Sequence, residues 1–232
     1  MTPRNATPRN AGSAQQPSPT FGSLIAARLD RLPFTRSLWR LVVLISLGGA
    51  FELYDIFLST YIAPGLVSSG LFASSTAGLF AVNGIGFFIF CTFAGMFLGC
   101  MGFGSIADRL GRRPIFISSL IWYSVCSAMM AFQTSAAGVD TWRFIASIGV
   151  GLEQVTIDTY LPEFVPPRLR GRAFAFYQFV EFCVVPIVAL LGWLLVPRRP
   201  FGMEGWRCVT LIGSAGALIA WWLRRRPVLP FP

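Results

Sequence analysis

The feature that most limits the possible folds is a short charged segment, residues 104–113, between two long apolar stretches. It reads G-S-I-A-D-R-L-G-R-R and includes Asp108, Arg109, Arg112 and Arg113. On insertion scales, one charged side chain at the centre of a bilayer costs about 2.5–3.5 kcal/mol. We therefore expect this segment to lie in water beside a membrane, with an apolar helix crossing the bilayer on each side of it.

The composition agrees with a protein that crosses the membrane several times. Of the 232 residues, 54% are hydrophobic and 12% are charged, and the mean hydropathy is +0.63. A soluble domain of this length cannot bury so much apolar surface, whereas a transmembrane helix needs roughly 20 apolar residues. The apolar segments near that length are residues 41–63, 79–103, 114–132, 142–164, 173–196 and 206–223. The sequence thus predicts an all-α membrane protein with six transmembrane helices.

The distribution of arginine predicts the domains and their orientation. The basic residues are all arginines, and they cluster before the first apolar segment, after the second and fourth, and at the end of the chain. Few lie at the opposite ends of the segments, so the positive-inside rule places the arginine-rich ends and both termini in the cytoplasm. The predicted domains are a disordered cytoplasmic tail (1–38), a six-helix bundle (39–224) and a cytoplasmic end (225–232). We expect the bundle to lie in the inner membrane.

Several classes of protein are disfavoured. The chain has no histidine, and its five cysteines are scattered without a C-x-x-C pair, so we expect neither a metal site nor a cofactor. The net charge of +9 lies in short clusters between apolar segments, which does not resemble a nucleic-acid-binding face. No nucleophile, base and orienting group form a recognisable catalytic motif, so we do not expect an enzyme.

Acidic side chains inside the predicted spans are the candidate functional residues. They are Glu52, Asp55, Glu153, Asp158 and Glu181. Such groups must face a water-filled cavity, pair with a cation or hold a proton. Glu52 and Asp55 are three residues apart and share a helix face, and Arg143 is the natural counter-charge. We predict a proton-coupling group of Asp55, Glu52, Arg143 and Glu153, with a purely structural ion pair as the alternative.

Close helix packing is also predicted within the second apolar segment. Gly95 and Gly99 form a G-x-x-x-G pair, and small residues at this spacing allow two helix backbones to approach closely.

Four motifs together resemble the major facilitator superfamily of transporters. They are F-E-L-Y-D (51–55), the charged segment 104–113, R-F-I-A-S-I-G-V-G-L (143–152) and P-E-F-V-P-P-R-L-R-G-R (162–172). They occur in the family's order and spacing, and they look most like those of metabolite and sugar proton symporters. The resemblance implies that the six helices form the amino-terminal half of the major facilitator fold.

The resemblance also implies roles for individual residues. Asp55 matches the acid that takes the coupling proton, and Arg143 matches its partner. A cytoplasmic conformational latch is implied for Gly104, Asp108, Arg109, Gly111, Arg112, Arg113, Glu163, Arg170 and Arg172. Charged groups at one end of a bundle can form and break salt bridges as the bundle rocks.

The predicted function is proton-coupled transport of a small organic metabolite, of sugar or organic-acid type, across a membrane, with this chain as the amino-terminal half of the transporter.

 The expected partners are therefore the lipid bilayer, a small-molecule substrate, protons, and either a second half-transporter or a second copy of the chain, with no nucleic acid. Two alternatives stay open: a truncated, inactive transporter fragment, and a membrane-embedded partner of a full-length relative.

Overall fold

The computed structural model describes residues 36–72, 84–110 and 112–225. Nearly all of the expected cytoplasmic tail (1–38) and cytoplasmic end (225–232) therefore lies outside the described residues, as does Gly111 of the expected latch. The description that follows concerns the helical unit alone.

Each of the six apolar segments forms a long helix. The helices are α2 (Arg36–Ser68), α3 (Ile85–Leu110), α4 (Arg112–Ala131), α5 (Ala136–Phe164), α6 (Arg170–Leu195) and α7 (Gly205–Arg225), with short 3₁₀ turns at Pro167–Leu169 and Pro200–Gly202. Each helix is longer than the apolar segment that predicted it. In particular, α3 continues to Leu110 through part of the charged segment 104–113, because backbone hydrogen bonding does not stop where a bilayer ends.

Four of these helices are long and apolar enough to cross a membrane. They are Leu38–Ser68, Ile85–Gly102, Pro167–Leu195 (including the preceding 3₁₀ turn) and Gly205–Leu223, and a shorter apolar stretch occupies Ile117–Ala131. The helix α5 contains four charged positions within its first 23 residues, at Asp140, Arg143, Glu153 and Asp158. It is therefore less apolar than the others, although three of those four side chains are buried within the bundle.

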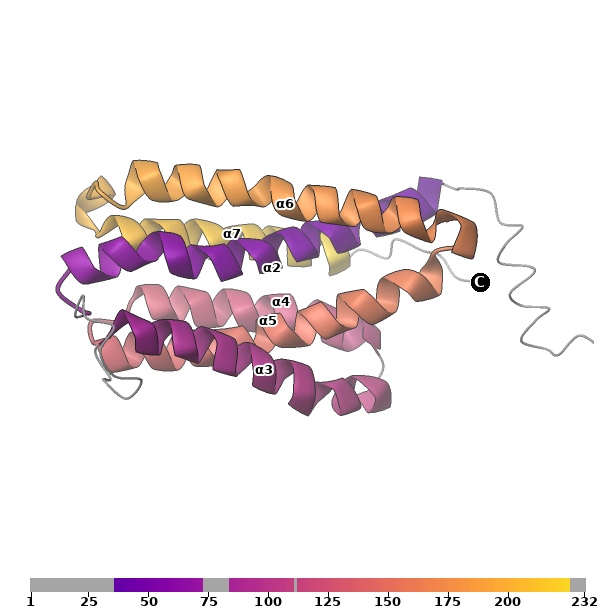
Figure 1. Cartoon of the computed structure of the whole chain (residues 1–232), viewed down its shortest axis with the longest axis horizontal. Coiled ribbons are helices and arrows are strands. Elements are labelled where there is room, and N and C mark those ends of the chain that lie inside the picture. Colours follow the sequence, from indigo (N-terminus) through magenta and orange to yellow (C-terminus); the bar gives the residue numbers. More distant parts are fainter. Residues whose placement is uncertain (1–35, 73–83, 111, 226–232) are drawn as a thin grey trace, which may run out of the picture. The chain divides into compact units, whose positions relative to one another are not determined.

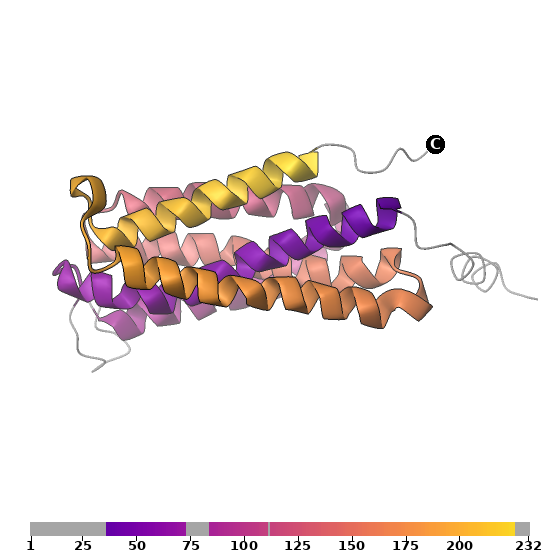
Figure 2. The ribbon, with the colours of Figure 1, turned by 90° about the horizontal axis from the view of Figure 1, so that it is seen from above.

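The helices form two layers of three (Figure 1). The helices α2, α6 and α7 lie in one layer, while α3, α4 and α5 lie in the other. Contacts of α4 with α7 and of α2 with α5 join the layers. Figure 2 views the bundle from above, with α6 and α7 passing over α4 and α5.

The direction of each helix brings the arginine-rich ends together. The start of α2, the junction of α3 with α4, the junction of α5 with α6 and the end of α7 all lie at one end of the bundle (Figure 1). We call this the arginine-rich end. The junction of α6 with α7, which contains Arg198 and Arg199, lies at the opposite end. The charge asymmetry of the sequence is thus an asymmetry of the folded bundle.

Glycines allow α3 and α5 to pack backbone against backbone. A Cβ atom added at Gly99 would lie 3.1 Å from both the Ile148 carbonyl carbon and the Leu152 amide nitrogen, and closer still to the Ile148 carbonyl oxygen. Gly95 is similarly close to the main chain at Phe144. The predicted role of the G-x-x-x-G pair in close helix packing is therefore confirmed.

Candidate functional site

A buried ion pair joins the two layers at the centre of the bundle. The Nη1 atom of Arg143, on α5, lies 2.7 Å from Oδ1 of Asp55, on α2. The Nη2 atom of Arg143 also donates to the main-chain oxygen of Asp55, at 2.9 Å. The exposed fractions of the two side chains are 0% and 1%, so the pair is removed from water. The structure thus brings into contact the two residues that the sequence analysis named as the candidate acid and its counter-charge.

The third donor of Arg143 contacts a neighbouring helix. Its Nε atom donates to the hydroxyl of Thr92 on α3, at 3.0 Å, and that hydroxyl donates to the carbonyl of Phe88, at 3.1 Å. The Phe88 ring centroid lies 5.9 Å from the guanidinium carbon. The hydroxyl of Ser59 on α2 lies 3.4 Å from that of Thr92. Three helices therefore fix the position of the guanidinium group.

The second carboxylate oxygen of Asp55 is not engaged by Arg143. Its Oδ2 atom is buried and has no hydrogen-bond partner among the described residues. A buried carboxylate is stable only while a cation and hydrogen bonds compensate for its lost hydration. Arg143 therefore engages one carboxylate oxygen of Asp55 and leaves the other without a hydrogen bond.

Other candidate proton-coupling residues are buried but lie apart from the ion pair. Glu52 is 3% exposed and lies one turn from Asp55 toward the arginine-rich end. Glu153 is 2% exposed and lies ten residues after Arg143 on α5, which is about 15 Å along a helix. The structure therefore brings Asp55 and Arg143 into contact and does not place Glu153 beside them.

Sequence reasoning missed two residues of this region. Thr92 is the one hydroxyl side chain in the apolar stretch 85–102. A single polar side chain in such a stretch could have marked it as a candidate site residue. Asp140 was missed because the predicted segment began at Trp142, whereas α5 begins four residues before Asp140. The hydroxyl of Ser135 caps this helix by accepting a hydrogen bond from the Gly138 amide, at 3.2 Å.

The expected latch residues belong to several helices, and most of their side chains lie outside the part of the chain that the structure describes. Gly104, Asp108 and Arg109 belong to the last turns of α3, whereas Arg112 and Arg113 begin α4 and Glu163 lies near the end of α5. The side chains of Arg170 and Arg172 are exposed at the start of α6. Arg170 donates from Nε to the Val165 carbonyl, at 3.2 Å. These residues all belong to helix ends at the arginine-rich end of the bundle.

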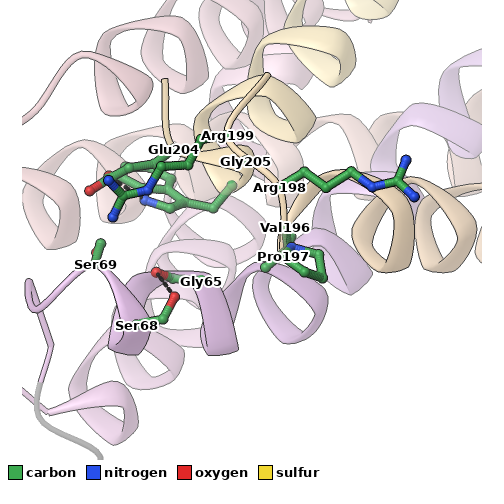
Figure 3. Close-up of a pocket in the computed structure, with 10 residues that line it drawn as sticks. Gly65, Ser68, Ser69, Val196, Pro197, Arg198, Arg199, Glu204 and Gly205 are labelled. Carbon is green, nitrogen blue, oxygen red and sulfur yellow. Dashed lines mark hydrogen bonds between the residues drawn. The ribbon is translucent and has the colours of Figure 1, made fainter. Parts of the chain in front are cut away.

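A cavity of about 270 Å³ opens at the opposite end, between α2 and the α6–α7 junction (Figure 3). Its lining residues are Gly65, Ser68, Ser69, Val196, Pro197, Arg198, Arg199, Glu204, Gly205 and Trp206. The Ser68 hydroxyl donates to the Gly65 carbonyl, at 3.1 Å, and Arg198 extends away from Glu204 (Figure 3). Because Ser68 follows Asp55 by about 20 Å of helix, this cavity is separate from the ion pair.

A family model described as "Sugar (and other) transporter" matches residues 41–224. The niacin transporter NiaP of Acinetobacter baylyi is 26% identical over 194 residues, which cover 84% of this chain and 41% of that protein. The benzoate transport protein of the same organism is 26% identical over 208 residues, covering 87% of this chain and 41% of that protein. The chain thus spans less than half the length of the curated relatives it matches.

A solved structure has the same fold. The inward-open xylose transporter XylE from E. coli aligns with a TM-score of 0.69 and 19% identity, over 81% of this chain and 48% of that chain. The aligned part of that transporter is about half of its length.

Proposed function

The chain belongs to the sugar (and other) transporter family of the major facilitator superfamily, and from this premise we propose that it carries a small organic acid across a membrane together with a proton. Members of this family are multi-pass membrane transporters and not enzymes. The prediction of an all-α membrane protein with half of the major facilitator fold is confirmed. Proton coupling and the substrate are our proposals.

The buried pair of Asp55 and Arg143 is the observation on which proton coupling rests. In the proposed cycle, a proton adds to the carboxylate of Asp55 and removes its negative charge. The guanidinium of Arg143 then loses its counter-charge, so the contact that joins α2 to α5 weakens. Loss of this contact would let the two layers rearrange, which is how proton binding would be coupled to the change in access.

Two relatives favour an organic acid over a sugar as the substrate. The niacin and benzoate transport proteins are named for aromatic acids. The likeness to the xylose transporter, at 19% identity, supports the fold and gives no argument for a sugar. We therefore propose a small aromatic carboxylate as the substrate class.

Transport would also require a second wall for the substrate site. Substrate sites of secondary transporters lie near mid-membrane between structural repeats. We propose that a second six-helix half faces this bundle, supplied by a second copy of the chain or by another chain. Chemical cross-linking in membranes tests this partner: a cross-linked species of twice the monomer mass indicates a second copy, whereas a chain recovered only as a monomer contradicts both forms of the proposal.

The arginine-rich end is proposed to face the cytoplasm at the inner membrane, with the latch residues at that surface. In this arrangement the arginines at the start of α4 and α6 would exchange ionic partners with Asp108 and Glu163 as the layers move. The support is the grouping of these helix ends at one end of the bundle together with the positive-inside rule.

Uptake of radiolabelled benzoate and niacin into proteoliposomes tests the function. With an inward proton gradient, the unmodified chain should accumulate a probe, and Asp55→Asn should lose gradient-driven uptake while retaining exchange of labelled for unlabelled probe. Asp158→Asn changes an exposed acid on α5 in the same way and should leave uptake intact. Accumulation by Asp55→Asn at the unmodified rate would remove Asp55 from the mechanism. No uptake by the unmodified chain would contradict transport by this chain alone.

A further inference from the structure

Asp140 is a buried carboxyl that the proposed mechanism does not yet use. It is 3% exposed, and neither of its side-chain oxygens has a hydrogen-bond partner among the described residues. Its helix neighbours Ala136 and Val139 belong to an apolar cluster that also contains Phe88 and Met130. An ionised carboxylate without a cation or a donor is costly in such surroundings, which favours the protonated form of Asp140.

The position of Asp140 relates it directly to the ion pair. It precedes Arg143 by three residues on α5, so the two side chains are neighbours on one helix face, about 4.5 Å apart along the axis. The donors of Arg143 are directed instead to Asp55 and Thr92. Because α5 begins at the end opposite the arginine-rich end, Asp140 lies between the ion pair and that opposite end.

The buried cation on the same helix as Asp140 is Arg143. On α3, Cys91 is close enough to interact electrostatically with Asp140. On α4, Tyr123 interacts with Arg143, and on α2 the nearby charge is that of Asp55. Arg143 is the only buried basic side chain among the described residues.

Resting on the proposed function, we propose that Asp140 and Asp55 share one proton and one guanidinium group. In the structure, Asp140 carries the proton and Arg143 pairs with Asp55. In the second state, the O–H bond of Asp140 breaks, an O–H bond forms on Asp55, and Arg143 turns to the Asp140 carboxylate. The net charge of the three groups stays the same, so neither state leaves an unpaired charge in the bundle. Asp140 is then the entry point of the proton, and Arg143 is the moving part.

A double-mutant cycle on thermal stability tests this exchange in the full chain, reconstituted in lipid nanodiscs. Asp140→Asn removes a carboxyl that has no partner, so its melting temperature should equal or exceed that of the unmodified chain. In Asp55→Asn, Asp140 can ionise and pair with Arg143, which limits the loss. The double variant leaves Arg143 with neither carboxylate, so its melting temperature should fall by more than the sum of the single shifts. Additive shifts would overturn the proposal.

A second measurement follows the proton itself. The infrared C=O band of a protonated carboxyl should be present near neutral pH, and Asp140→Asn should remove part of it. Asp55→Asn should remove the same part, because Asp140 ionises there, and Asp158→Asn should leave it in place. An unchanged band in Asp55→Asn overturns the exchange. Neither measurement requires transport, so they can fail while benzoate uptake still depends on Asp55, and the two proposals are judged separately.

Discussion

The close contact of α3 with α5 yields a prediction that depends on backbone geometry alone. We expect Gly99→Ala to destabilise the bundle, whereas Gly102→Ala, one turn later on α3, should not. A Cβ at Gly99 would overlap the main chain of α5 near Ile148, and main-chain atoms cannot move aside as a side-chain tip can. A Cβ at Gly102 meets no atom within 4 Å.

The expected size of the effect follows from this overlap. Ordinary carbon contacts lie at about 3.5–4.0 Å, so α3 and α5 would have to separate near Gly99, with a loss of packing along both helices. Overpacking of this kind costs about 1–3 kcal/mol. The change from glycine to alanine also adds up to about 1 kcal/mol of helix propensity, and the Gly102 control gains it equally. At about 2–4 °C per kcal/mol for a chain of this size, Gly99→Ala should melt roughly 2–12 °C below Gly102→Ala.

Thermal unfolding of the two purified variants in the same detergent, followed by the loss of the monodisperse peak in size-exclusion chromatography, measures this difference. Comparing the two alanine variants cancels the propensity gain and isolates the steric term. Equal melting temperatures would show that the backbone contact between α3 and α5 is absent in the folded protein, and the packing described above would be wrong.

Three further predictions concern the ion pair, the α2–α7 contact and the orientation. Arg143→Leu should lower stability by about 3–5 kcal/mol because it leaves the carboxylate of Asp55 buried without a cation, and adding Asp55→Leu should recover much of this loss in thermal unfolding. Tyr54→Phe removes a 2.8 Å hydrogen bond to the main chain of α7 and should cost about 1 kcal/mol by the same assay. In a variant without native cysteines, a membrane-impermeant maleimide added to intact cells should label Arg199→Cys and leave Arg168→Cys unlabelled; the reverse pattern would invert the proposed topology.

Helix positions could be predicted from the sequence because the bilayer imposes a simple condition on each segment by itself. A span needs an apolar run of sufficient length, and its flanking arginines bias its orientation, so residues 41–63 or 173–196 can be recognised without their neighbours. Helix ends were less predictable. The first turns of α5 were missed because they contain Asp140, a polar side chain that becomes buried only within the folded bundle.

The sequence by itself determined the six apolar segments, the family, and the choice of Asp55 and Arg143 as the central pair. Only the tertiary structure decided which acid meets the guanidinium, that Thr92 fixes it from a third helix, and that the Asp140 carboxyl is buried without a hydrogen-bond partner among the described residues. The physical reason is that an ion pair between α2 and α5 joins residues 88 positions apart in the chain. Such a contact depends on how the helices are layered and rotated, and no local pattern of residues records it.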